Sequence, residues 1–164
     1  MEHRPPPGND HDVVVVGAGP TGLMLAAELA LAGTDIVVVE RRTDQRVEGA
    51  RALGLLPRTI EVLDQRGVAD RFLDAGYVVG THGYAGIRFD ISDLPTRPPY
   101  VLALPQDEFE PLLADWVAEL DVPVLRGADV RAVTRLGDAG REGVRVQLVD
   151  GAASRTITAR YVVG

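Results

Sequence analysis

The chain has 164 residues, of which 46% are hydrophobic and 25% charged, values typical of a globular domain with its own core. Its formal net charge of −7 disfavours a nucleic-acid partner, because binding of the phosphate backbone needs a basic surface. The sequence contains no cysteine and no lysine, so disulfides, thiolate chemistry and Schiff-base lysines are excluded within it. We expect no metal site, no membrane-spanning segment and a cytoplasmic location.

The first 40 residues predict a βαβ unit. Residues 1–11 are polar and proline-rich, which predicts a disordered lead-in. The run at 12–16 is β-branched without alternation, as in a parallel strand buried on both faces. A glycine-rich turn at 17–22, a helix at 23–32 and a second apolar strand at 35–40 complete the unit, which is expected to cross over right-handedly.

The remaining residues predict further helices and an antiparallel meander. Asp107 and Glu110 have the spacing of a capping box, and Asp150-Gly151 is a hairpin signal. Residues 77–104 are rich in Gly, Pro, Tyr and β-branched residues and predict a β-ribbon with a loop. In order, the expected elements are helices at 57–66 and 68–73, a strand at 83–89, a helix at 107–120, a strand at 122–125, and three meander strands at 129–136, 143–149 and 155–163. The predicted fold class is therefore α/β, a Rossmann-like βαβ unit with a partly parallel sheet and an appended antiparallel meander.

The glycine-rich turn carries the chemistry that the sequence predicts. A GxGxxG pattern alone is weak evidence, but this one follows a strand, opens a helix and is followed by an acidic strand end, Glu40. Gly17 permits the tight turn, Gly19 lets a diphosphate approach the backbone, and Gly22 with Ala26 lets the helix pack closely on the strands. Backbone N–H groups at the helix N-terminus favour the anion. The candidate contacts are Gly17, Ala18, Gly19, Pro20, Thr21 and Gly22.

Glu40 restricts the choice of cofactor. Its carboxylate can accept hydrogen bonds from the adenosine ribose hydroxyls and would repel a 2′-phosphate, which favours FAD or NAD over NADP. The position of the motif near the N-terminus and the lack of a following βαβ repeat favour FAD. Two alternatives stay open: an NAD-binding module of a dehydrogenase, and a non-catalytic flavin-binding or assembly fragment that needs a second chain.

The sequence resembles a known family over residues 12–164. The resemblance is carried by residues 13–22, by Val39-Glu40-Arg41, by residues 49–61 and by Leu104-Pro105-Gln106 with Glu110. These stretches are similar to the N-terminal part of class A flavoprotein monooxygenases, the para-hydroxybenzoate hydroxylase-like group, and most of all to aromatic-polyketide hydroxylases of antibiotic pathways. The resemblance implies an enzyme that hydroxylates an aromatic polyketide or phenolic substrate with FAD, NADPH and O₂.

The resemblance also implies roles for single residues. Glu40 would hold the adenosine ribose and Arg41 would lie beside the adenine. Arg51 and Gln106 would contact the ribityl and pyrophosphate region of the flavin, and Val130 would meet the adenine through its backbone. No catalytic acid or base is assigned.

In the family an Asp-Gly motif follows the position of Gly164. We therefore expect residues 12–164 to form the N-terminal part of an FAD-binding domain, truncated before that motif and the substrate domain. The expected partners are an aromatic small molecule and the remainder of the same protein or a second chain.

Overall fold

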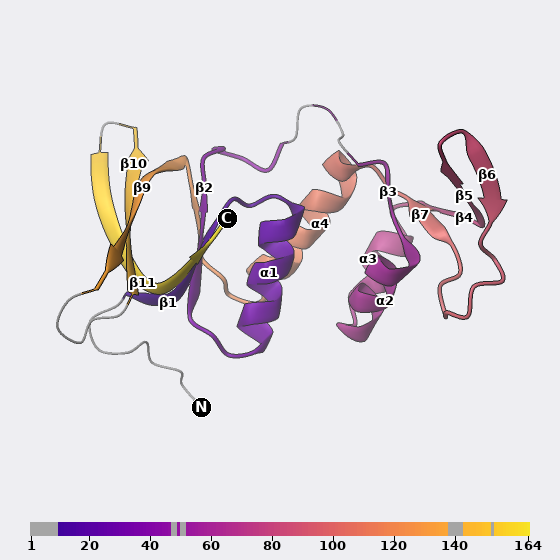
Figure 1. Ribbon diagram of the computed structural model, residues 1–164, viewed down its shortest axis with the longest axis horizontal. Helices are drawn as coiled ribbons and strands as arrows, with labels where there is room; N and C mark the ends of the chain where they lie inside the picture. Colours follow the sequence, from indigo (N-terminus) through magenta and orange to yellow (C-terminus); the bar gives the residue numbers. More distant parts are fainter. Residues whose placement is uncertain (1–9, 47–48, 50–51, 138–142, 152) are drawn as a thin grey trace. The chain divides into compact units, whose positions relative to one another are not determined.

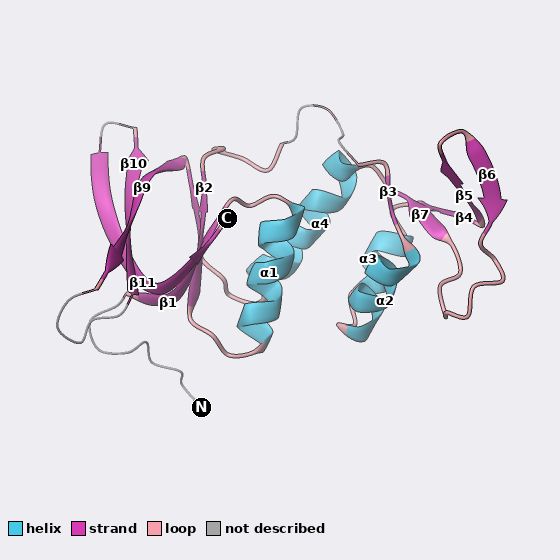
Figure 2. Ribbon diagram, viewed as in Figure 1, coloured by secondary structure: helices cyan, strands magenta, loops and turns pink. Residues whose placement is uncertain are grey.

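The computed structural model describes residues 10–46, 49, 52–137, 143–151 and 153–164. The chain divides into two compact units, unit 1 with Met1–Gln45 and Leu113–Gly164, and unit 2 with Arg46–Leu112. Figures 1 and 2 show the elements of both units. In the described part of the chain, no helix combines the length and the apolar character needed to cross a membrane.

A six-stranded sheet forms the frame of unit 1, with the strand order β8-β2-β1-β11-β10-β9. The first four of these strands pair in parallel, whereas β9, β10 and β11 form an antiparallel meander. β11 belongs to both parts, so the predicted meander is joined to the parallel sheet through its pairing with β1. The bounds are β1 (His11–Val16), β2 (Ile36–Glu40), β8 (Val124–Arg126), β9 (Ala128–Leu136), β10 (Gly143–Asp150) and β11 (Ala153–Val163).

The core of unit 1 explains why β1 shows no polar alternation. On one face of the sheet, Val14 and Val39 belong to a buried cluster with meander residues such as Leu148. On the other face lies α1 (Pro20–Leu31), which contacts β1 and β2 and buries Leu23 and Ala26. Both faces of the two central strands are thus removed from water, as the continuous valine runs predict.

Unit 2 contains two short sheets and most of the remaining helices. One sheet has the order β3-β7-β4, and β5 and β6 form a separate two-stranded sheet. The buried side chains of unit 2 include Ile60, Phe72 and Leu102. The bounds are β3 (Gly54–Leu55), α2 (Pro57–Gln65), α3 (Ala69–Leu73), β4 (Tyr77–Val79), β5 (Thr81–Tyr84), β6 (Ile87–Asp90) and β7 (Val101–Ala103), and α4 (Gln106–Glu119) contains the boundary between the units.

The single strand predicted at 83–89 is wrong, because the chain turns back inside it. Tyr84 pairs with Ile87, and the two residues between them, Ala85 and Gly86, have φ values of 51° and 81°. Two consecutive positive φ angles are those of a type I′ turn, whose twist matches that of a two-residue β-hairpin. The predicted ribbon is therefore present, as the hairpin of β5 and β6.

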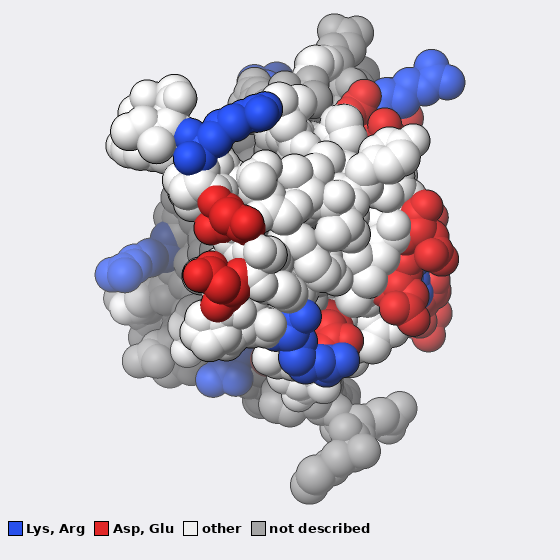
Figure 3. Space-filling view, turned by 90° about the vertical axis from the view of Figure 1, so that its right-hand side faces the viewer, with Lys and Arg blue, Asp and Glu red and all other residues white. Residues whose placement is uncertain are grey.

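This hairpin has an apolar face that is exposed in unit 2. His82 pairs with Phe89 and their rings meet edge to face at 5.8 Å, while Tyr84 pairs with Ile87. Residues two apart on a strand share a face, so these four side chains lie together. Tyr84 and Ile87 are 79% and 69% exposed. Figure 3 shows a face of the molecule on which uncharged side chains occupy the centre and charged side chains lie around them.

Several predicted boundaries also shift. α1 begins at Pro20 rather than at residue 23. Proline is favourable at the first position of a helix, because the N–H that it lacks would make no hydrogen bond within the helix there. The predicted capping box is wrong: α4 begins at Gln106, and the carbonyl of Pro105 accepts the first helical hydrogen bonds.

Two strands also begin at other residues than predicted. β8 begins two residues after the predicted start at 122, because the N–H of Val122 still bonds to the carbonyl of Val117 in α4. β1 begins at His11, one residue before the predicted domain boundary, and residues 1–9 lie outside the described residues.

Candidate functional site

The glycine-rich turn joins β1 to α1 beside the end of β2. Gly17 has a φ of 104°, and its N–H donates to the carbonyl of Val39 at 2.7 Å. Gly19 is the N-cap residue of α1, with φ −79° and ψ 179° and no side-chain cap. Among the described residues no acceptor takes the N–H of Gly19. The N-terminus of α1 therefore presents uncapped donors and the positive end of the helix dipole.

These donors border a cavity at the point where the strand order reverses. β2 lies on one side of β1 and β11 on the other, and in open α/β sheets ligands bind at the carboxyl ends of strands at such a point. The cavity measures ≈ 280 Å³ and is mostly apolar. It is lined by Val15, Val16, Gly17, Gly19, Pro20, Thr21, Gly22, Leu25, Val163 and Gly164. The structure thus gathers five of the six predicted turn residues around one cavity, while Ala18 is fully buried and does not line it.

Two glycines of the turn are required for different reasons. A Cβ at Gly22 would lie 1.9 Å from the carbonyl oxygen of Gly17, so this glycine allows the helix to approach the strand. A Cβ at Gly19 would meet no protein atom within 4 Å. The fold does not demand a glycine at position 19, and the open space there is the kind of cradle that a bound diphosphate needs.

Glu40 ends β2 and is 7% exposed. Its Oε2 accepts the N–H of Ala18 at 2.6 Å, and its Oε1 accepts the N–H and Nε–H of Arg42 at 2.7 and 3.4 Å. Burial acts to raise the pKa of Glu40, but the hydrogen bonds from Arg42 and Ala18 and the charge of Arg42 outweigh it and hold this pKa below its ordinary value. The carboxylate is therefore ionised at neutral pH and keeps acceptor capacity for a further donor, such as a ribose hydroxyl.

Three polar residues that have no signal in the sequence form a hydrogen-bonded cluster with this carboxylate and the turn. Arg42 and Gln45 both donate to the carbonyl of Ala18, and Arg126 donates to the side chain of Gln45. Arg126 ends β8 and is the register partner of Glu40 in β2. Nothing in the spacing of the arginine-rich segment 41–51 distinguishes Arg42 or Gln45, because the pairing of β2 with β1 brings them to the turn and the pairing of β2 with β8 adds Arg126.

Two other predicted residues lie in unit 1. Arg41 follows β2 directly and is exposed. Val130 lies in β9, next to a bulge where Gln147 pairs with Ala132 and Leu148 pairs with Val130. Val130 packs against the buried cluster that contains Val39. Their contacts to adenine stay predictions.

Gln106 is in unit 2 and Arg51 lies outside the described residues. The N–H of Gln106 donates to the carbonyl of Ala52 at 3.0 Å, so β3 and β7 bring Gln106 to the residue that follows Arg51 in the chain. Its Nε2 donates to Glu110 at 2.9 Å, and Glu110 is 1% exposed. This buried carboxylate orients the side chain of Gln106, whose flavin contact stays a prediction.

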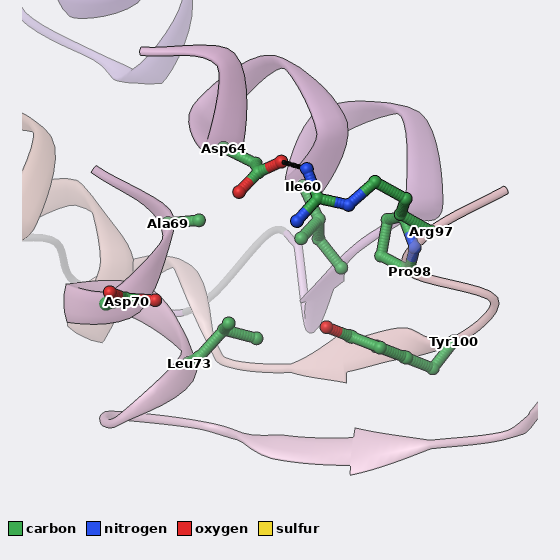
Figure 4. A pocket seen from close by; sticks show the side chains of 8 residues that line it. All are labelled: Ile60, Asp64, Ala69, Asp70, Leu73, Arg97, Pro98 and Tyr100. Atoms are coloured by element: carbon green, nitrogen blue, oxygen red, sulfur yellow. Dashed lines mark hydrogen bonds and ion pairs between the residues drawn. The ribbon is translucent and has the colours of Figure 1, made fainter. Parts of the chain in front are cut away.

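A second, smaller cavity of ≈ 190 Å³ lies within unit 2 (Figure 4). Arg97 donates to Asp64 at 2.7 Å across its rim, and Tyr100 points toward its apolar wall, which includes Ile60 and Leu73. Its eight lining residues include none of the predicted cofactor contacts.

Strand, glycine turn, helix and acidic strand end together define a dinucleotide-binding domain. The model of the FAD binding domain family matches residues 10–164, and the chain belongs to this family. A rifampicin monooxygenase of Streptomyces venezuelae is 45% identical to it over 155 residues, which cover 93% of this chain and 31% of that protein.

Solved structures are similar as well. An anhydrotetracycline hydroxylase of Streptomyces rimosus matches with a TM-score of 0.86 at 38% identity, over 94% of this chain and 31% of the hydroxylase. An aklavinone-11 hydroxylase, solved as a ternary complex with FAD and aklavinone, matches with a TM-score of 0.78 at 28% identity, over 95% of this chain and 32% of that one. The chain thus spans about 30% of the length of these relatives.

Proposed function

We propose that this chain is the FAD-binding part of a flavin-dependent monooxygenase that hydroxylates an aromatic polyketide or phenolic substrate with NADPH and O₂. The family match supports the cofactor, and the names of the similar proteins support the class of reaction and of substrate. In such a reaction one oxygen atom of O₂ enters a ring C–H bond and the other leaves as water, while NADPH and a proton supply the two reducing equivalents.

One observation carries the proposal. Position 19 has open space where a side chain would fit, at the uncapped N-terminus of a 12-residue helix and beside a cavity at the switch point of the sheet. Together these features suit the diphosphate of FAD. Ionised Glu40 lies at the end of the adjacent strand, where its remaining acceptor capacity suits a ribose.

The residues of this chain would bind and orient the cofactor. Bound flavin supplies the redox chemistry, and the protein supplies binding, orientation and exclusion of water. The turn residues 17–22 would hold the diphosphate and Glu40 the adenosine ribose. Arg41 and Val130 are proposed to contact the adenine, and Arg51 and Gln106 the ribityl and pyrophosphate region.

The first test is binding of FAD to the purified chain. We expect the protein to quench FAD fluorescence and to show the visible flavin bands, with no comparable affinity for NADH. A protein that binds NADH but not FAD would be the dehydrogenase module. A protein that binds neither would refute the proposal.

The second test is Gly19→Val, with Gly80→Val as its matched control. Both glycines have open space around the Cβ position and lack a positive φ, so neither substitution strains the fold. At position 19 the added side chain occupies the proposed diphosphate cradle, and we expect the Kd for FAD to rise at least about 100-fold through loss of several charge-assisted hydrogen bonds. Gly80→Val should bind like the wild type. Equal FAD affinity of Gly19→Val and the wild type would rule out the phosphate-binding role of the turn.

A further inference from the structure

Two consecutive peptide groups of the glycine-rich turn are held by side chains from elsewhere in unit 1. The N–H of Ala18 belongs to the Gly17–Ala18 peptide and donates to Glu40 at 2.6 Å. The carbonyl of Ala18 belongs to the next peptide, Ala18–Gly19. It accepts Nη2–H of Arg42 at 3.3 Å and Nε2–H of Gln45 at 3.1 Å.

A third residue, Arg126 at the end of β8, holds Gln45 in this arrangement. The guanidinium of Arg126 donates to the side-chain oxygen of Gln45 and, at 3.3 Å, to the carbonyl of Asp44. A glutamine amide has one oxygen and one NH₂ group, so a donor on its oxygen leaves the NH₂ group directed at Ala18. Arg126 therefore determines which end of Gln45 faces the turn.

The planarity of the peptide bond transmits this constraint to the cofactor side. The chain has no cis peptide among its described residues, and in a trans peptide the C=O and the following N–H point in opposite directions. When Arg42 and Gln45 hold the carbonyl of Ala18, the N–H of Gly19 must point away from them. Gly19 lines the cavity, and its N–H has no acceptor among the described residues.

We propose that Arg42, Gln45 and Arg126 are positioning residues, which fix the Ala18–Gly19 peptide so that the N–H of Gly19 faces the diphosphate. This inference rests on the proposed function, because the diphosphate is that of FAD. Arg42 has a second role, since it also bonds to Glu40 and so couples the proposed ribose contact to the proposed phosphate contact. None of the three side chains needs to touch the cofactor to raise its affinity, since the peptide is already oriented before binding.

The test compares Arg42→Met, Gln45→Leu and the double variant with the wild-type chain. The measured quantities are the Kd values for FAD and for ADP, by fluorescence quenching and calorimetry, and the melting temperature of the cofactor-free protein. We expect Gln45→Leu to raise both Kd values about threefold and the double variant to raise them about tenfold or more, as the loss of one and of two such hydrogen bonds implies. Arg42→Lys, which keeps a charged donor, should recover part of the affinity. Arg88→Met is the charge-matched control, because Arg88 is exposed in β6 and belongs to unit 2.

Binding is measured well below the melting temperature, so a loss of stability alone does not change the Kd. A further readout is the amide signal of Gly19 in the cofactor-free protein by NMR, which should move more than that of Gly80 in the double variant. If the wild type binds FAD and the double variant binds FAD and ADP equally well, the positioning role is refuted while the proposed function stands. If the wild type binds neither ligand, both are refuted. A Gly19 amide signal that does not move in a folded double variant also contradicts the positioning role.

Discussion

The contact between Gly22 and Gly17 allows a quantitative prediction for Gly22→Ala. The new Cβ would lie 1.9 Å from the carbonyl oxygen of Gly17 and 3.1 Å from its carbon. Both neighbours are backbone atoms, and real Cβ atoms essentially never come closer than 3.0 Å to another heavy atom. The start of α1 must therefore move away from the end of β1 by about 1.1 Å, and no side-chain rotation can relieve the clash.

The expected cost follows from what this movement disrupts. Leu23 and Ala26 lie in the next turn of α1 and are fully buried, so displacement of the helix opens a close-packed contact. Overpacking of a well-packed core costs about 1–3 kcal/mol, and a backbone clash belongs at the upper end of that range. For a chain of this length, about 3 kcal/mol corresponds to a fall in melting temperature of about 6–12 °C.

The assay is thermal and urea unfolding of the cofactor-free protein, followed by circular dichroism. Gly19→Ala is the matched variant in the same turn, because its Cβ would meet no atom within 4 Å and its φ of −79° suits alanine. We expect Gly19→Ala to unfold within about 0.5 kcal/mol of the wild type. If Gly22→Ala unfolds at the wild-type temperature, the close approach of helix and strand described here does not exist.

Two further predictions concern Glu40 and the core. The folded-state pKa of Glu40 lies below its unfolded value near 4.5, so its ionised form stabilises the fold above pH 4.5 and this stabilisation is lost as the pH falls through the folded pKa. We expect Glu40→Gln to be about 1–3 kcal/mol less stable than the wild type at pH 7. This difference in stability should shrink below pH 4.5. Urea titrations that give the same difference at pH 7 and pH 3 would contradict the prediction. Leu148→Ala, at a fully buried position of β10, should cost about 2–5 kcal/mol in the same titrations, and a cost below 1 kcal/mol would place Leu148 outside the core.

Local patterns in the sequence were sufficient for the βαβ unit and the meander. The valine runs of β1 and β2, the glycine spacing between them and the Asp150-Gly151 turn are signals within a few residues of one another. The same reasoning failed for residues 83–89 and for the start of α4. In the first case an Ala-Gly pair formed a type I′ turn, for which Ala is an uncommon first residue. At the start of α4, the first N–H groups of the helix bond to the carbonyl of Pro105 and not to the predicted side-chain cap.

The sequence by itself determined the glycine-rich turn, its acidic partner and the family of the domain, because each depends on residue types at short, fixed spacings. Only the tertiary structure decided what surrounds the turn. The pairing of β1 with β11, nearly 150 residues later, brings Val163 and Gly164 to the cavity, and the pairing of β2 with β8 brings Arg126 to Gln45. Such contacts have no local signature, since strand order and register are fixed by the burial of both faces of a whole sheet rather than by the residues that meet. The pairing of β1 with β2 brings the two donors, Arg42 and Gln45, to the carbonyl of Ala18, and with them the orientation of the peptide that is proposed to meet the cofactor.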